Sequence, residues 1–502
     1  MKKVSMMPKG LLLISLFLSV KIGIAQTRPN YQKALGILDK AIKTTGKDAP
    51  NSITLTAKGT IHNLGHYETP EKTRDLPVEE IYAYFEKEQV NYLRSAMQNN
   101  GNSVVRSSIT KADSMYYIGY YDRRVVATNN IQEFSFESAK TLPIKLLQFV
   151  YQHRQSLRHL GGDKTHDWLS FNYKPNNAVT LYINKKTFLL DKVEQLAYND
   201  RYGDAIFTTE YKNYKLLNGL QIPKNRTESE YGMIERELTY ENIRFDAKPD
   251  TANFRLLWLP KTFRDRLATN RTTKDSLVVE NIAPQLDLVK IVSQNNKVLV
   301  AQFKDYVALF ESPAGLGLNE QILQEIQKRY APKLLRYVFV THHHPDHAGG
   351  IRAFATMPVT LVTTQGNEAY FKKLLATTHT LGNKLSNAES LKLKMDFVPI
   401  EGQKSYKDEE MEVVAYEIGK ATSHSNEHLA YYFPKQKLIW SGDLLFFRTD
   451  GKIYPAGGRG KSVYDLIQNQ KLAVDKIYTS WPLHGQAAFG TVEELKKAID
   501  MK

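Results

Sequence analysis

The chain has 502 residues, a formal net charge of +15, 42% hydrophobic residues, 11% aromatic residues and no cysteine. That length suits two or three separate cores, the apolar content excludes a disordered chain, and a mean hydropathy of −0.43 excludes a bundle of membrane helices. The lack of cysteine excludes disulfides, thiolate nucleophiles, thiolate zinc sites and iron–sulfur clusters, so any metal must be held by His, Asp and Glu.

The first 25 residues have the pattern of a secretory signal peptide. A basic start, MKKVSMMPKG, precedes a ten-residue apolar run that is too short to span a bilayer comfortably, and the small residues Gly23 and Ala25 precede Gln26. We therefore expect a periplasmic or secreted chain, whose net charge becomes +11 when the four lysines of residues 1–25 are removed. An uncleaved amphipathic anchor is the alternative, because Lys21 lies beside the cleavage site.

Residues 27–260 are predicted to form a first, β-rich domain. The stretch 31–45 places its apolar residues on one face of a helix, and Gly46 follows as a C-cap. A second helix is predicted at 142–160. Alternating runs rich in Tyr and Val predict antiparallel strands with one solvated face at 52–64, 114–129, 178–199, 206–223 and 234–246. The expected fold is a curved antiparallel sheet with helices packed across it.

Residues 278–502 follow a polar linker, predicted at 261–277, and have a different pattern. Strands such as NKVLVAQF and LLRYVFV alternate with amphipathic helices at 319–331, 463–474 and 492–499, which indicates an α/β domain. The whole chain is thus of the α+β class with two domains. Lys and Arg form no basic block in either domain, so nucleic acid is not an expected partner.

The stretch RYVFVTHHHPDHAGG at 336–350 carries the densest group of metal-binding residue types. An apolar strand ends at Thr341, and His342, His344, Asp346 and His347 follow within six positions. Pro345 disfavours a continuous helix, and the glycines after Ala348 let the next helix start close to the sheet. Imidazole and carboxylate are the ligands that zinc accepts when no thiolate is available, so the pattern predicts a metal site.

Three later segments supply further candidates, each beside the end of a predicted strand. SHSNEHLAYYF offers His424 and His428, LIWSGDLLF offers Asp443, and SWPLHGQ offers His484. Each of them alone is more often a surface polar residue than a ligand. Together with the histidine loop, however, they are numerous enough to hold two metals and leave an exchangeable position.

With these residues in place, the region 278–502 resembles the metallo-β-lactamase fold superfamily through the HxHxDH signature of the histidine loop. The resemblance implies an αβ/βα sandwich with two zinc ions at the rim of its sheets. It implies that the first zinc is bound by His342, His344 and His424, the second by Asp346, His347 and His484, and that Asp443 bridges them. It identifies the fold more sharply than the substrate.

Details of the resemblance bear on the subclass. The best-known β-lactamases have a cysteine where Asp443 stands, so the ligand set is similar to the broader hydrolase branch that includes glyoxalase II. His428 corresponds to the second histidine of the HTxGH loop, which is not normally a ligand, and this favours His424. Many relatives have an aspartate near the end of the strand YVALFES, whereas this chain has Glu311, which puts the hydrogen bonds around the ligands in doubt.

The first domain is similar to the LolA-like half-barrels that carry lipoproteins in bacterial envelopes, through its leading helix, its hairpins and the stretch YKNYKLLNGLQIPKNRTE. This implies a lipid or hydrophobic ligand and contact with a membrane surface. A structural module without a ligand is the other interpretation, because alternation alone cannot distinguish a filled core from an empty one.

The function implied is that of a secreted zinc-dependent hydrolase. A hydroxide held between two metals attacks an ester, thioester, lactone or amide of a small-molecule substrate, and Asp346 orients it and carries its proton to the leaving group. The alternative is an envelope protein that binds lipid and has a vestigial metal domain. An iron-dependent redox role is disfavoured, since no flavodoxin-like segment follows the metal domain. Segments 364–396 and 446–462 are expected to be loops that border the site.

Overall fold

The computed structural model describes residues 11–46, 51–87, 90–99, 101–111, 114–119, 124–128, 131–175, 177–199, 201–245, 277–313, 315–381 and 391–501. The chain forms two compact units. The first consists of Met1–Ile61, Leu76–Ala197 and Ile206–Thr269, and the second of His62–Asp75, Tyr198–Ala205 and Asn270–Lys502. Two short segments from the first half of the chain therefore belong to the second unit.

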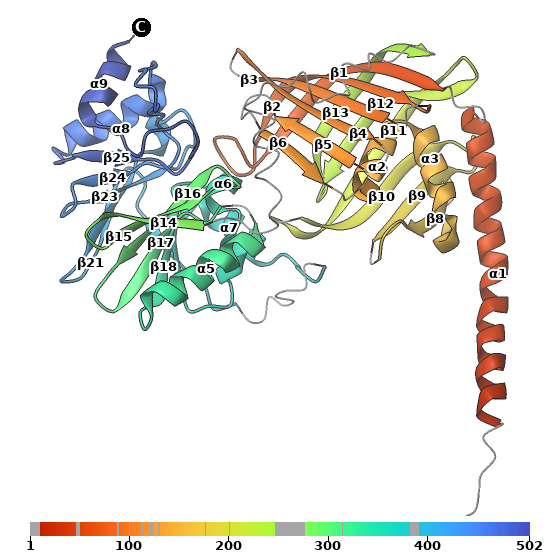
Figure 1. Ribbon diagram of the computed structural model, residues 1–502, viewed down its shortest axis with the longest axis horizontal. Coiled ribbons are helices and arrows are strands. Elements are labelled where there is room, and N and C mark those ends of the chain that lie inside the picture. Colours follow the sequence, from red (N-terminus) through yellow and green to blue (C-terminus); the bar gives the residue numbers. More distant parts are fainter. Residues whose placement is uncertain are drawn as a thin grey trace, which may run out of the picture. The chain divides into compact units, whose positions relative to one another are not determined.

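The first unit is built on one 13-stranded sheet (Figure 1), and every strand pair whose register is described in it is antiparallel. In sheet order the strands are β6 (Arg124–Thr128), β5 (Ser114–Gly119), β4 (Asn102–Lys111), β3 (Val90–Asn99), β2 (Thr73–Phe85), β1 (Ser52–Leu64), β13 (Met233–Phe245), β12 (Leu220–Glu230), β11 (Gly203–Leu217), β10 (Leu190–Asn199), β9 (Ala178–Asn184), β8 (His166–Asn172) and β7 (Arg158–Gly162). The predicted antiparallel sheet is confirmed.

Helices cover one face of this sheet. They are α1 (Leu11–Gly46), α2 (Ile131–Ala139) and α3 (Pro143–Gln152), followed by the short turn η1 (Arg154–Ser156). The apolar face predicted for 31–45 is buried, since Ala34, Leu38 and Ala41 share a core with residues of α3 and of strands such as β9. The helix predicted at 142–160 ends earlier, at Gln152, because Arg158 already pairs with Ser170 in the sheet.

The predicted signal peptide and the predicted linker lie only partly within the described residues. Helix α1 begins at Leu11 and so includes part of the predicted signal, whose cleavage stays a prediction. None of the helices within the described ranges is long and apolar enough to cross a membrane. The predicted linker 261–277 lies outside the described residues except for Leu277, where the next strand begins.

The second unit contains two sheets packed face to face. The seven-stranded sheet has the order β14 (Leu277–Ala283), β15 (Leu286–Ile291), β16 (Asn296–Gln302), β17 (Tyr306–Phe310), β18 (Leu334–Phe339), β19 (Thr360–Thr364) and β20 (Lys394–Val398). The five-stranded sheet has the order β21 (Gln403–Lys407), β22 (Glu412–Glu417), β23 (Leu429–Phe433), β24 (Leu438–Trp440) and β25 (Lys476–Tyr478). Their shared core includes Phe310 and Phe339 from one sheet and Tyr431 and Trp440 from the other, all fully buried.

Helices and short turns complete the second unit (Figure 1). They are α5 (Leu316–Tyr330), α6 (Pro345–Ala348), η4 (Ile351–Phe354), η5 (Gln365–Asn367), α7 (Glu368–Leu375), η7 (Gly419–Ala421), α8 (Gly457–Asn469) and α9 (Val492–Asp500). Helices α8 and α9 pack on the outer face of the smaller sheet, where Val463 and Leu495 join a second core. The segments expected to be loops at 364–396 and 446–462 contain α7 and the start of α8, because residues such as Phe371 find buried positions.

Candidate metal centre

The histidine loop follows β18, and the glycine after it, Gly350, packs closely against Asn319. The strand leads through the buried residues Val338 and Phe339 into Thr341 and the three consecutive histidines, and α6 begins at Pro345. A Cβ atom at Gly350 would lie 1.8 Å from Nδ2 of Asn319, so only glycine fits there. This explains why a glycine follows the short helix, as the sequence suggested.

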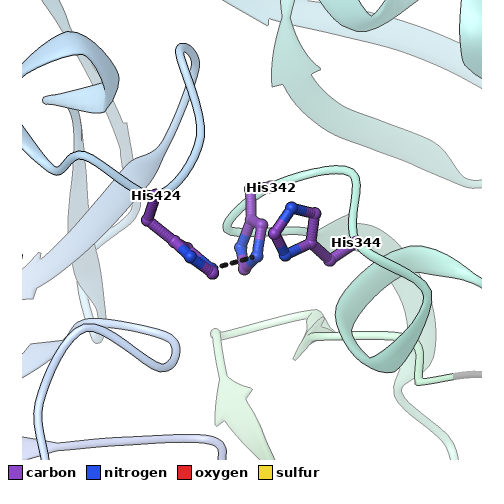
Figure 2. A group of neighbouring side chains, drawn as sticks. All are labelled: His342, His344 and His424. Atoms are coloured by element: carbon purple, nitrogen blue, oxygen red, sulfur yellow. Dashed lines mark hydrogen bonds between the residues drawn. The ribbon is translucent and has the colours of Figure 1, made fainter. Parts of the chain in front are cut away.

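Three histidines face one another at the end of the sheets (Figure 2). One ligand atom from each of His342, His344 and His424 can be chosen so that all lie within 4.8 Å of one another, and we call this the three-histidine group. The Nε2 atoms of His342 and His424 are 3.0 Å apart. His342 and His344 come from one loop and His424 from the loop before β23, so the group joins the edges of both sheets.

A second group shares His342 and contains a carboxylate. His342, His347 and Asp443 meet the same distance condition, and we call them the mixed group. Oδ1 of Asp443 lies 3.8 Å from Nε2 of His342, 3.7 Å from Nε2 of His347 and 3.0 Å from Nε2 of His424. One carboxylate oxygen therefore faces imidazoles of both groups.

Asp443 is placed by a tight turn after β24. Gly442 has φ 68°, in the left-handed region, and a Cβ atom there would lie 2.8 Å from Oγ1 of Thr341. The Nη1 atom of Arg459 is 3.8 Å from Oδ2 of Asp443, so a guanidinium offsets part of the carboxylate charge.

Glu311 orients two of the histidines. It is fully buried after β17, and its Oε1 accepts hydrogen bonds from Oγ1 of Thr341 at 2.8 Å and from Nδ1 of His347 at 3.1 Å. Because the Thr341 hydroxyl donates to Glu311, it is free to accept from Nδ1 of His342 at 3.0 Å. Both imidazoles thus turn Nε2 toward Oδ1 of Asp443. Glu311 therefore makes the hydrogen bonds around the ligands that were in doubt because many relatives have an aspartate near this position.

The electrostatics of the two metal-binding groups favour a cation. Burial and the neighbouring histidines hold the pKa values of His342 and His344 well below the ordinary value, so both rings are neutral and able to bind a metal. Burial alone would lower the pKa of His347, but the carboxylates of Asp346, Glu311 and Asp443 raise it to about 10. A positive charge is therefore stabilised beside these carboxylates.

Buried polar atoms without hydrogen-bond partners test whether a metal fits. Nε2 of His347, Oδ1 of Asp443 and Oδ1 of Asp346 are buried and make no hydrogen bond within the chain. Leaving such atoms unpaired costs about 1–3 kcal/mol each, and more for charged groups. All three are of the types that coordinate zinc, so the donor set fits a metal ion.

The remaining predicted site residues lie outside both groups. Nε2 of His428 is 3.2 Å from the Ser441 carbonyl, and burial lowers the pKa of this histidine to about 3. His484 is exposed, and its Nε2 is 3.1 Å from the Val292 carbonyl. Asp346 is partly exposed, with Oδ2 3.5 Å from Nε2 of His347.

Comparison with known proteins finds a family match for this part of the chain. Residues 313–502 match the family described as the metallo-beta-lactamase superfamily. Among solved structures, the chain is similar to a metallo-beta-lactamase from Pontibacter korlensis, with 16% identity over 45% of this chain and 98% of that one, at a TM-score of 0.34. It is also similar to the DIM-1 metallo-beta-lactamase, with 16% identity, 45% and 96% coverage and a TM-score of 0.33.

A third similar structure is the metallo-beta-lactamase FIM-1 from Pseudomonas aeruginosa in its mono-zinc form, with 14% identity, 45% and 96% coverage and a TM-score of 0.33. No curated protein matches the chain. The resemblance of the first half to LolA-like half-barrels stays a prediction. The region that matches the metallo-beta-lactamase superfamily, residues 313–502, contains the histidine loop, His424 and Asp443.

Proposed function

We propose that this chain is a zinc-dependent hydrolase that holds two metal ions and cleaves an ester, thioester, lactone or amide bond in a small molecule. The position of Asp443 carries the proposal. Its Oδ1 lies within 3.8 Å of Nε2 of His342, His347 and His424, which come from both metal-binding groups. A carboxylate that bridges two metals needs this arrangement.

Zinc is the metal that suits the donors, since the centre offers imidazole and carboxylate groups and the chain has no cysteine. Bound zinc lowers the pKa of a bound water to about 7 and polarises a carbonyl oxygen. The chain's own groups do the rest. Asp346 keeps 37% of its side chain exposed, so it can accept a proton from the attacking water and pass it to the leaving group.

The completeness of the site supports an enzyme over a vestigial metal domain in a lipid-binding protein. The two groups together contain the imidazole and carboxylate side chains that a metal ion needs. Hydrogen bonds with Thr341 and Glu311 orient the rings of His342 and His347. We further propose, from the signal-like residues 1–25, that the protein acts in the periplasm or outside the cell. We also propose that the first unit contacts a lipid or a membrane surface.

The test is metal analysis and a substrate screen on the full chain. Zinc-loaded protein is expected to hold two equivalents of metal and to hydrolyse at least one of nitrocefin, an acyl-thioester, a lactone or a carboxylic ester. His342→Ala should lose both metals and turnover, because His342 belongs to both groups. The control His166→Ala removes an imidazole that bonds Asp191 in the first unit, and should keep both. Undiminished turnover by metal-free protein would refute the proposal.

A further inference from the structure

Two segments from the first half of the chain pack into the unit that holds the metal-binding groups. They are His62–Asp75, which connects β1 to β2, and Tyr198–Ala205. Nε2 of His344 lies 2.9 Å from the Tyr67 carbonyl, in the first of these segments. Because a carbonyl oxygen can only accept a hydrogen bond, Nε2 of this ring carries the proton. Nδ1 is then the atom of His344 that is able to bind a metal.

The next carbonyl of the same segment holds the loop that carries His424. The Asn426 amide donates a hydrogen bond to the Glu68 carbonyl at 2.7 Å, and Asn426 is two residues after His424. His344 follows the seven-stranded sheet and His424 precedes a strand of the five-stranded sheet. Two adjacent carbonyls thus bond one member of the three-histidine group and the loop of another, so this stretch fixes how the two loops lie relative to each other.

The residues before these carbonyls pack against the histidine loop. The ring centroid of His66 is 5.3 Å from that of His344, and its Nε2 lies 3.6 Å from Oδ1 of Asp346. Gly65 has φ 75°, and a Cβ atom there would lie 3.5 Å from Cγ of Pro345. The segment therefore lies along the histidine loop as well as bonding its second imidazole.

Arg201, from Tyr198–Ala205, fixes the start of this segment. Its Nη1 donates to the Leu64 carbonyl at 2.9 Å, and a hydrogen bond from a charged donor is stronger than a neutral one. A Cβ atom at Gly65 would lie 2.4 Å from the same nitrogen, so a glycine leaves room for the guanidinium. The backbone that leads to His66 and Tyr67 is held in place by this contact.

A second contact of Tyr198–Ala205 is directed elsewhere. The Asp204 carboxylate accepts hydrogen bonds from the amides of Thr380 at 3.0 Å and Leu381 at 2.9 Å, and the Asp204 amide donates to the Thr378 carbonyl at 2.7 Å. These partners are not members of the metal-binding groups. Asp204 therefore supports the same unit without reaching the segment around Tyr67.

We propose that the segment His62–Asp75, fixed by Arg201, positions the three-histidine group for metal binding. It sets the ring nitrogen that His344 offers to a metal, and it places the loop that carries His424. Arg201 is a positioning residue, because its guanidinium acts on the group through the backbone of this segment. The metal centre then depends on both halves of the sequence although its predicted ligands all lie in residues 278–502. The inference rests on the proposed metal centre.

Metal affinity of the full chain gives the first test. Arg201→Ala is expected to bind its first metal equivalent at least about tenfold more weakly than the unmodified chain in a chelator competition. Gly65→Ala should have the same effect, because the added Cβ displaces the guanidinium. The matched control Asp204→Ala removes hydrogen bonds from the same segment as Arg201, and should lose stability but keep its metal affinity.

The outcomes separate this proposal from the proposed function. If Arg201→Ala and Gly65→Ala bind metal as tightly as the unmodified chain, the positioning role is wrong and the two-metal hydrolase still stands. An equal loss of affinity in Asp204→Ala would also overturn it, because any weakening of the unit would then have the same effect. If the unmodified chain binds no metal, both proposals fail. Circular dichroism checks that each variant is folded.

The ring of His344 gives a second test that needs no metal. In the metal-free chain labelled with nitrogen-15 histidine, Nε2–H of His344 is expected to exchange slowly with water, because it bonds the Tyr67 carbonyl and the residue is buried. Loss of the signal in His344→Ala identifies it. The exchange should become at least about tenfold faster in Arg201→Ala and stay slow in Asp204→Ala. Slow exchange in Arg201→Ala would overturn the role of Arg201.

Discussion

Replacing Glu311 by Gln should weaken metal binding although Glu311 touches no metal-facing atom. Oε1 accepts from Oγ1 of Thr341 and Nδ1 of His347, while Oε2 accepts from the Thr341 amide at 3.2 Å. An amide of the same size has one oxygen and one NH₂ group. In Glu311→Gln the NH₂ group therefore faces one of the N–H or O–H donors of Thr341 and His347. The remaining hydrogen bonds go to a neutral amide oxygen instead of a charged carboxylate.

The size of the effect follows from these contacts. An unsatisfied buried donor costs about 1–3 kcal/mol, and hydrogen bonds to charged groups contribute about 1.5–3 kcal/mol, so the free energy of unfolding of the metal-free chain should fall by about 3 kcal/mol. Loss of a partner that orients a ligand typically weakens metal binding about 10- to 100-fold. We expect both changes in Glu311→Gln.

Chelator competition measures the metal affinity and urea denaturation measures the stability. Glu417→Gln is a matched control, because Glu417 is also buried and accepts backbone hydrogen bonds from Gly419 at 2.6 Å and Glu401 at 2.8 Å. The control should lose stability but keep its metal affinity. If Glu311→Gln binds zinc as tightly as the unmodified chain, then Glu311 does not orient His342 and His347, and the reasoning is wrong.

Three further predictions concern the turn, the pH dependence and the core. Gly442→Ala should weaken metal binding, because its Cβ would lie 2.8 Å from Oγ1 of Thr341 and displace Asp443; unchanged affinity by chelator competition would contradict this. The pKa of His347 is raised to about 10. The contribution of the charged His347 ring to the stability of the metal-free chain is therefore complete below about pH 6.5 and is lost as the pH rises toward 10. Urea titrations at pH 7 and pH 10 should show this loss of stability, and equal unfolding midpoints would contradict it. Leu181→Ala in the first unit should lower the free energy of unfolding by about 2–5 kcal/mol and leave the metal content unchanged, as calorimetry and metal analysis can check.

The histidine loop was predictable because local sequence determines it. An apolar strand, a run of four metal-competent residues and two glycines lie within 15 positions, and the structure places His342, His344 and His347 in the two groups. Asp443 was predictable for the same reason, since it follows a strand and the glycine of a tight turn.

His66 and Glu311 could not be placed in this way. His66 lies in a hairpin of the first sheet, and no local pattern shows that its segment packs beside Asp346. Glu311 adopts φ 76°, which is uncommon for a residue other than glycine, and this conformation is set by tertiary contacts. The order of motifs along the chain also says nothing about side-chain direction: His484 stays a predicted ligand, and its Nε2 lies 3.1 Å from the Val292 carbonyl.

The centre is oriented by hydrogen bonds that come from three separate parts of the sequence. Glu311 fixes His347 directly and His342 through Thr341, so one buried carboxylate sets ring nitrogens that serve both metal-binding groups. The Tyr67 carbonyl accepts a hydrogen bond from Nε2 of His344, which leaves Nδ1 of this ring able to bind a metal. These constraints act before any metal binds, and they reduce the entropy lost when the ligands close around it. A chain with zinc ligands but without this support would bind metal more weakly, so the segment around Tyr67 belongs to the metal centre as much as the histidine loop does.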